Sequence, residues 1–272
     1  MNIPSEALVS FVINLTIAIV IFILGILAHR AYDFIYNRIP YYKIWGFERK
    51  SEINVVTGNI RFETDASKSD SDYSALMASG DIDALVEVIS SLKLIYPKAK
   101  IRRFFTEEYP ERVIDENLIT IGGPVWNTVT RRVLETIKSP LYFDKNLKLI
   151  DLISKQEYET TEKDGKPVKD YGIVLKIPNP YDKDNCLILI AGCDTYGVLA
   201  GSKCISYLTK KGHEFVHKIS KSIGFLHIKK YFAAIVSADI VKEDVFSVKI
   251  IKFYQVHLKD DGNYLFVLHD LN

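Results

Sequence analysis

The chain has 272 residues, of which 48% are hydrophobic and 25% are charged, a balance typical of a protein that buries a core. Its 35 Lys and Arg residues nearly balance its 34 Asp and Glu residues, and the net charge of +1 creates no overall field that attracts nucleic acid. We therefore expect one main folded unit with an appendage and no nucleic-acid partner. The three cysteines, Cys186, Cys193 and Cys204, lie in apolar stretches without CxxC spacing, which predicts reduced core residues of a cytoplasmic domain.

An uncharged stretch opens the chain: residues 7–28 read "ALVSFVINLTIAIVIFILGILA". As a helix it spans about 33 Å, enough for a bilayer core of about 30 Å. The flank before it carries only Glu6 and lacks the basic region of a signal peptide. These features predict a transmembrane anchor over residues 1–30, with a buried helix of a soluble protein as the alternative.

Basic residues follow the apolar stretch, and the positive-inside rule places that side in the cytoplasm. They are Arg30, Arg38, Lys43, Arg49 and Lys50. Tyrosines and a tryptophan between residues 32 and 45 predict an aromatic belt at the membrane surface. We therefore expect a single-pass protein of the inner cell membrane with its N-terminus outside, a juxtamembrane segment over 31–52 and a cytoplasmic domain over 53–272.

Short apolar runs alternate with helical patterns after residue 53, which is typical of βα units. The predicted strands are 53–58, 99–105, 117–123 and 185–192, and the predicted helices are 81–96, 128–137 and a segment after 194. Between residues 141 and 179 the pattern becomes antiparallel, with "DGKP" as a hairpin turn, and the last strands are expected at a sheet edge. The sequence predicts an α/β fold with a largely parallel sheet and an antiparallel extension.

Three predicted joints share one design, in which a strand ends on glycine and a helical pattern follows. In a parallel sheet such joints lie at one edge, where ligands bind; glycine allows close approach of the backbone, and free N–H groups at helix starts attract phosphate or carboxylate. The candidate ligand-binding residues are Gly58, Gly122, Gly123, Asn127, Thr128, Gly192, Asp194 and Thr195. The alternative is that the glycines only make tight turns, with Asn127 and Thr195 as helix caps.

Two further features bear on such a site. Arg131 and Arg132 follow Asn127 closely, so one of them could reach an anion at the helix start, unless both lie on a solvated helix face. Neither GxGxxG nor GxxxxGK[ST] occurs, which excludes a dinucleotide fingerprint and an ATP-hydrolysing loop.

The pairing of "IGGPVWN" (121–127) with "LILIAGCDTYGVLAGS" (187–202) resembles the Rossmann-like outer domain of archaeal S-layer proteins. It is also similar to bacterial proteins with one N-terminal membrane anchor, some associated with nucleotide-signalling defence systems. The resemblance covers residues 116–210 and implies a Rossmann-like fold without an assigned catalytic residue. The anchor, the cytoplasmic orientation and the reduced cysteines depart from the S-layer pattern, so an S-layer-like role in the cell envelope stays an alternative.

The sequence "HEFVH" matches the zinc-peptidase motif, in which His213 and His217 would bind zinc and Glu214 would activate water. Ser220 occupies the glycine position of the longer form of this motif, and a third ligand such as Glu243 has no motif support. We expect a surface helix without metal here, with a membrane-anchored zinc metallopeptidase as the alternative function.

No nucleophile, acid or base stands in a recognisable catalytic pattern, so the sequence favours binding over catalysis. We expect a membrane-anchored sensor or effector that recognises a nucleotide or a nucleotide-derived anionic signal, in bacterial defence signalling, and relays its state to the bilayer. The cofactor and the oligomeric state are left open.

Overall fold

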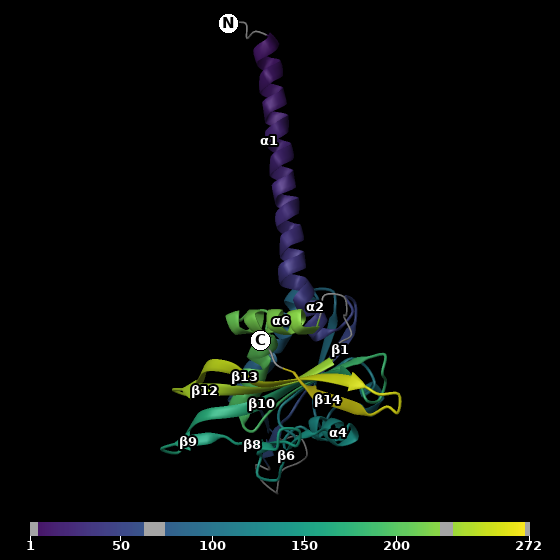
Figure 1. The fold of residues 1–272 in the computed structure, drawn as a ribbon, viewed down its shortest axis with the longest axis vertical. Coiled ribbons are helices and arrows are strands. Elements are labelled where there is room, and N and C mark those ends of the chain that lie inside the picture. The colour runs from purple at the N-terminus through teal and green to yellow at the C-terminus, as the bar shows by residue number, and fades with distance from the viewer. Residues whose placement is uncertain (1–4, 63–73, 224–230, 270–272) are drawn as a thin grey trace. The chain divides into compact units, whose positions relative to one another are not determined.

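The computed structural model describes residues 5–62, 74–223 and 231–269, and it divides into two compact units, Met1–Pro40 and Tyr41–Asn272 (Figure 1). The second unit begins at Tyr41, whereas the sequence predicted the start of the folded domain at Ile53. The aromatic residues between these two positions belong to the folded unit.

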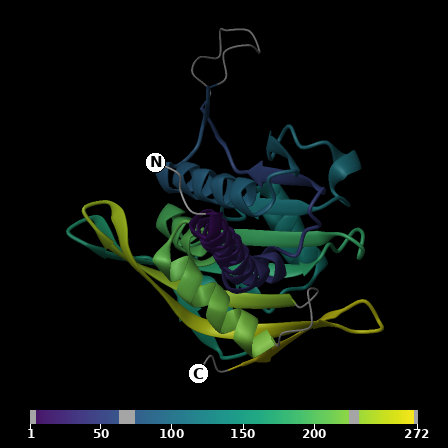
Figure 2. The ribbon, with the colours of Figure 1, turned by 90° about the horizontal axis from the view of Figure 1, so that it is seen from above.

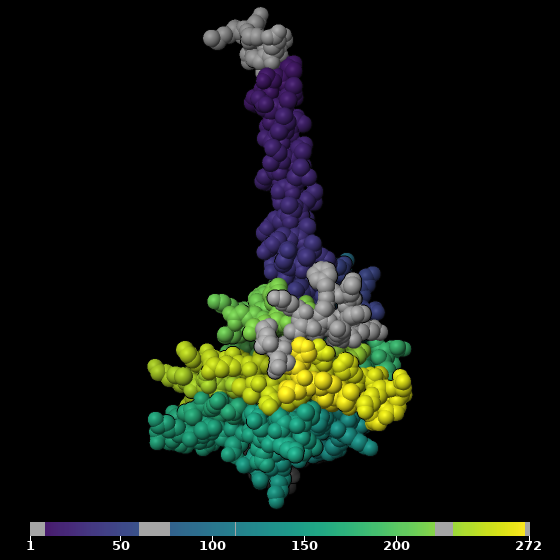
Figure 3. All heavy atoms as spheres, viewed as in Figure 1, coloured from purple at the N-terminus to yellow at the C-terminus, as the bar shows by residue number. Residues whose placement is uncertain are grey.

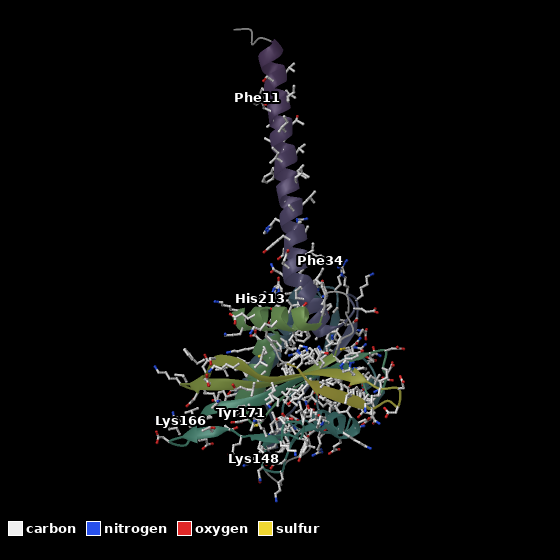
Figure 4. The ribbon with its side chains drawn as sticks, viewed as in Figure 1. Phe11, Phe34, Lys148, Lys166, Tyr171 and His213 are labelled. Carbon is white, nitrogen blue, oxygen red and sulfur yellow. The ribbon has the colours of Figure 1, made fainter. Side chains whose placement is uncertain are left out.

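The first unit consists of the helix α1 (Ser5–Tyr32), the π-helix η1 (Asp33–Arg38) and the start of α2 (Ile39–Trp45). Apolar side chains such as Phe11 and Phe22 are exposed around α1, and Phe11 stands out from the helix in Figure 4. One segment, Val9–Trp45, is long and apolar enough to cross a membrane, and its most apolar window is entirely exposed. A core helix of a soluble protein buries such a surface, so this exposure is what a membrane anchor requires.

The second unit begins with the buried half of α2. Tyr41, Ile44 and Trp45 are fully buried, and the Tyr41 hydroxyl donates a hydrogen bond to the carbonyl oxygen of Ser206 (2.9 Å). The fully buried Lys176 donates through its ammonium group to the carbonyl oxygen of Lys43. Tyr41 and Trp45 were expected in an aromatic belt, but the structure uses them as core residues.

The main sheet has nine strands within the described residues, in the order β14-β13-β12-β10-β11-β5-β1-β4, with β9 paired to β10. The parallel strands are β1 (Glu52–Thr57), β4 (Lys100–Phe105), β5 (Leu118–Ile121) and β11 (Cys186–Gly192). The antiparallel strands are β9 (Thr161–Lys163), β10 (Lys166–Pro178), β12 (Tyr231–Val241), β13 (Asp244–Leu258) and β14 (Tyr264–Leu268). The mixed α/β class is confirmed. The antiparallel extension is as wide as the parallel part because β9–β10, β12–β13 and β13–β14 are joined by hairpins, which place consecutive strands antiparallel, whereas α5 and α6 lie between β11 and β12.

Helices and a small sheet cover the two faces of the main sheet (Figures 1 and 2). On one face lie α3 (Ser79–Ile95), α5 (Thr195–Ile205) and α6 (Lys210–Ile223). On the other lie α4 (Thr128–Thr136) and the strands β6 (Leu141–Phe143), β7 (Leu149–Asp151) and β8 (Gln156–Tyr158). Successive residues point to opposite faces of the sheet, so Val55 and Ile119 join the first core while Val56 and Leu118 join the second. This alternation explains why the central strands are apolar throughout.

The polar stretch between β1 and α3 contains two short antiparallel strands, β2 (Ile60–Phe62) and β3 (Ser74–Leu76). The middle of this stretch lies outside the described residues. A short 3₁₀ helix, η2 (Glu111–Val113), precedes β5.

The three cysteines are buried, and none of them forms a disulfide. Burial raises the pKa of the Cys193 and Cys204 thiols to about 12, so both are protonated at neutral pH. They pack as small apolar residues, as the sequence predicted.

Candidate functional site

The three glycine joints meet at one edge of the sheet. Strand β5 lies between β1 and β11, with Ile121 in register with Thr57 on one side and Ile190 on the other. The N–H of Gly58 donates to the carbonyl oxygen of Ile121 (3.2 Å), and the N–H of Gly122 donates to that of Ile190 (3.0 Å). The joints are therefore bonded directly to one another.

Close approaches within the protein account for the four glycines. Gly122 has φ +111°, a conformation that side chains rarely allow. A Cβ added at Gly58 would lie 2.8 Å from the carbonyl oxygen of Trp126, and one at Gly192 would lie 2.4 Å from that of Asp194. A Cβ at Gly123 would lie 3.1 Å from the carbonyl oxygen of Gly192. Packing within the protein therefore explains the glycines at this edge, and no ligand is needed to explain them.

Asn127 is fully buried and uses its whole side chain within the protein. Its Nδ2 donates to the carbonyl oxygens of Val56 (3.2 Å) and Ile121 (3.0 Å), while its Oδ1 accepts from the N–H groups of Val129 and Thr130 (both 3.1 Å). Asn127 thus caps α4 and ties that helix to β1 and β5. The predicted ligand contact Thr128 is half-buried beside it and shares a hydrogen bond with Thr106 (2.8 Å).

Carboxylates of the protein occupy the start of α5. Asp194 caps the helix by accepting from the N–H of Thr195 (2.7 Å). The buried Asp170 accepts from the N–H groups of Gly197 and Asp194, the latter at 3.2 Å. A phosphate placed here would meet the carboxylates of Asp170 and Asp194 rather than free N–H groups. These carboxylates disfavour the anion that the sequence suggested at Asp194 and Thr195.

Asp81 is a site residue that is not among the candidates drawn from the sequence. The cap of α3 is Ala78, and Asp81 instead points to the start of α5, where its Oδ1 accepts from the Thr195 hydroxyl (3.0 Å). Burial, with a smaller effect of nearby Asp194, raises the pKa of Asp81 to about 6. Asn59, also buried, has a side-chain oxygen without a hydrogen-bond partner among the described residues. With the oxygens of Asp81 and Asn59, this part of the edge can accept hydrogen bonds and suits a ligand that donates them.

We expect Asp81→Asn to change how stability depends on pH. Because burial raises its pKa from 3.8 to about 6, the folded protein binds this proton more tightly than the unfolded chain. The stabilisation that comes from protonated Asp81 is therefore fully present below about pH 4 and is lost as pH rises through about 6. The substitution should raise the free energy of unfolding, relative to wild type, by up to about 3 kcal/mol more at pH 7.5 than at pH 4.

Urea unfolding of the full chain in detergent at both pH values measures this effect. Asp83→Asn, at an exposed position of the same helix, is the matched control. Burial also raises the pKa of Asp170 to about 6, so part of the pH dependence should persist in Asp81→Asn. Identical dependence of stability on pH in the Asp81 variant and in wild type would contradict the raised pKa of Asp81.

A cavity of about 510 Å³ opens immediately after the Gly122–Gly123 joint, along the face of α4. Its lining combines residues after the joint, residues of α4 and residues around β6, namely Pro124, Val125, Arg131, Leu134, Glu135, Lys138, Ser139, Tyr142, Phe143, Asp144 and Lys145. Arg131, Lys138 and Lys145 have no ion-pair partner within the described part of the chain, whereas Arg132 pairs with Glu111 (2.6 Å). The two adjacent arginines therefore differ, and only Arg131 faces the cavity.

The zinc-motif residues lie on α6, with His213 at the position labelled in Figure 4. The ring of His213 packs against Tyr41 and Tyr207, each with ring centroids 5.3 Å apart, and Glu214 pairs with Lys211 (3.0 Å). His217 is exposed, and burial of part of its ring lowers its pKa. The side chain suggested as a third ligand, Glu243, pairs with Lys166 (3.3 Å) on a different part of the sheet. Among the described residues no group of three potential ligands gathers here.

Comparison of the chain with protein-family models, with curated proteins and with solved structures gave no match. Sequence reasoning found the joints and Arg131, but it missed Asp81 as a site residue and the aromatic residues Tyr142 and Phe143. Those residues come from segments without a ligand-binding motif.

Proposed function

We propose that the protein is a membrane-anchored sensor or effector whose cytoplasmic α/β domain binds a nucleotide or a nucleotide-derived anionic compound in the α4 cavity. The observation that carries this proposal is the combination, in one cavity, of the aromatic rings of Tyr142 and Phe143 with cations that have no ion-pair partners among the described residues. The cavity lies directly beside the glycine joint from which the sequence predicted a ligand site.

The chemistry of the cavity suits such a compound. Its volume of about 510 Å³ falls within the range of small-molecule sites. The half-exposed rings of Tyr142 and Phe143 offer apolar area to a base, while Arg131, Lys138 and Lys145 offer donors to phosphate oxygens. The acids Glu135 and Asp144 reduce the local charge, so the cavity favours an anion with an aromatic part over inorganic phosphate alone.

The proposal changes the roles of the predicted binding residues. Gly122 and Gly123 shape the joint that leads to Pro124 and Val125 at the cavity wall. Asn127 holds α4 in place, because its polar atoms are already bonded within the protein. The ligand lies against the side of α4 rather than over its first N–H groups.

The anchor and the relay are further parts of the proposal. The exposed apolar helix supports anchoring, and the basic residues after it support a cytoplasmic domain by the positive-inside rule. A relay to the bilayer is supported by the burial of Tyr41 and Trp45, which packs the C-terminal end of the candidate span Val9–Trp45 into the same core as α3 and α5. The role in defence signalling depends on the sequence resemblance alone, and homo-oligomerisation stays open.

Nucleotide binding to the full chain in detergent, measured by calorimetry with ATP and with a cyclic dinucleotide as probes, tests the cavity. Arg131→Gln removes a charged donor and should weaken the binding of a probe about tenfold or more, with an unchanged melting temperature. Arg103→Gln, at an exposed position of β4, removes the same charge elsewhere and should leave affinity unchanged.

Mass spectrometry of small molecules released from the purified protein extends the test beyond these probes. A phosphorylated compound that is retained by wild type and lost from Arg131→Gln supports the proposal. The proposal fails if neither probe binds and no anionic compound is released, or if both arginine variants bind like wild type.

A further inference from the structure

A second cavity, of about 470 Å³, lies between α6 and the strands β13 and β14. In Figure 3 the green surface of α6 adjoins the yellow surface of these strands, and Figure 2 shows α6 crossing over that part of the sheet. We call this cavity the α6 groove. Its lining residues are Cys204, Lys211, Glu214, Phe215, Lys218, Val248, Lys249, Ile250, Ile251, Lys252, Phe253, Leu268 and His269.

The α6 groove concentrates positive charge in a chain whose net charge is only +1. Lys211, Lys218, Lys249 and Lys252 line it together with a single acid, Glu214. The two halves of the groove contribute equally, since two lysines come from α6 and two from β13. This arrangement contrasts with the edge formed by the glycine joints, where carboxylates gather.

The ion pairs at the α6 groove are weak enough to rearrange. Lys211 pairs with Glu214 and Lys249 with Asp239, both at 3.0 Å, but all four side chains are more than a third exposed. Exposed pairs of this kind contribute about 0 to 1 kcal/mol. Lys252 has no ion-pair partner within the described ranges, 5–62, 74–223 and 231–269.

The floor of the α6 groove adds apolar area and one polar group. His269 packs edge-on against Phe253, with ring centroids 6.3 Å apart. Its Nδ1 is buried without a hydrogen-bond partner among the described residues. Such a nitrogen can bond to an oxygen of a ligand that enters the groove.

We propose that the α6 groove is a second binding site, which takes the phosphate group of an anionic compound between the lysines of α6 and those of β13. Two sources share this chemistry: the headgroup of an anionic phospholipid and a soluble phosphorylated compound. A lipid source accords with the packing of α6, through His213, against Tyr41, which lies near the C-terminal end of the candidate span Val9–Trp45. This site is independent of the α4 cavity and of any ligand bound there.

The test measures the acylation rates of individual lysines by mass spectrometry, on the full chain reconstituted in nanodiscs. One arm compares phosphatidylcholine discs with discs that contain phosphatidylglycerol. The other arm adds inorganic pyrophosphate to phosphatidylcholine discs. Binding should lower the reactivity of Lys249 and Lys252 by about fivefold or more in at least one arm, because the interaction of about 1 kcal/mol between each lysine and an anionic group must be broken before the nitrogen can react.

The exposed Lys98 and Lys163 are internal controls whose reactivity should not change. Protection by phosphatidylglycerol alone identifies the lipid source, and protection by pyrophosphate identifies a soluble one. In Lys249→Gln/Lys252→Gln the protection of Lys211 and Lys218 should fall about fivefold or more, while Lys98→Gln/Lys163→Gln, which removes the same charge, should behave as wild type. Arg131→Gln should also behave as wild type, so failure of the α4 cavity and failure of the α6 groove are separate results.

The proposal is overturned if neither arm protects the groove lysines. It is also overturned if Lys98 and Lys163 are protected equally, because the effect is then general electrostatic attraction. The proposal fails as well if Lys211 and Lys218 are protected equally in Lys249→Gln/Lys252→Gln and in Lys98→Gln/Lys163→Gln.

Discussion

Asn127→Ala is expected to destabilise the second unit, Tyr41–Asn272, by about 3 to 5 kcal/mol, several times the cost of about 1 kcal/mol for losing a helix cap. The substitution removes four hydrogen bonds at a fully buried position. It leaves the carbonyl oxygens of Val56 and Ile121 without their side-chain donor, in a place that water does not reach. Urea unfolding of the full chain in detergent, followed by tryptophan fluorescence, measures the loss.

Asn127→Ser separates the two roles of this side chain. A serine hydroxyl can still accept from the N–H groups at the start of α4, but it is too short to donate to both strands. We therefore expect it to recover about 1 kcal/mol of the loss seen with alanine. If Asn127→Ala itself costs only about 1 kcal/mol, the link between α4 and the strands contributes little to stability.

Gly197→Ala should be at least as damaging, with an expected loss of more than about 3 kcal/mol. A Cβ added at Gly197 would lie 2.1 Å from the carbonyl oxygen of Tyr171 on β10. A Cβ at Gly172, on the strand itself, would lie 2.3 Å from the carbonyl oxygen of Gly197. The helix and the strand touch backbone to backbone, so α5 can accept a methyl group only by moving away from the sheet.

Two other helical glycines provide graded controls in the same unfolding experiment. A Cβ at Gly201 would lie 2.8 Å from the Cγ2 of Ile190, a side-chain atom that can shift, so Gly201→Ala should cost about 1 kcal/mol. A Cβ at Gly25 would have no neighbour within 4 Å, so Gly25→Ala should leave the unfolding of the second unit unchanged. Equal losses for Gly197→Ala and Gly201→Ala would show that the backbone contact is not the cause.

Most regular elements followed from local patterns. The sequence predicted a strand over 53–58 and helices over 81–96 and 128–137, and the structure has β1, α3 and α4 at these places with ends that differ by one or two residues. It also predicted the hairpin at Asp164 and Gly165 and the terminal strands at a sheet edge. These features depend on apolar periodicity and turn residues, which are properties of neighbouring residues in the chain.

The burial of the aromatic residues that follow the apolar stretch 7–28 could not be predicted in the same way. Tyr41 and Trp45 have the composition of a membrane belt, but they are buried because α3, α5 and α6 supply a complementary surface. Lys176 looks like an ordinary charged residue in a strand, but in the folded chain it is buried and donates to the carbonyl oxygen of Lys43, which is distant in the sequence. Burial depends on partners that are distant in the sequence, so local patterns do not specify it.

For the candidate site, the sequence by itself determined that glycine joints end three strands and that polar residues stand at the start of the helices after the second and third joints. The tertiary structure alone decided which polar groups remain free for a ligand. It satisfied Asn127 and the start of α5 internally, placed Asp81 against Thr195, and left Arg131 facing a cavity with Tyr142. The physical reason is that a hydrogen-bonding group is available to a ligand only when no other part of the folded chain has taken it, and those partners are set by long-range packing.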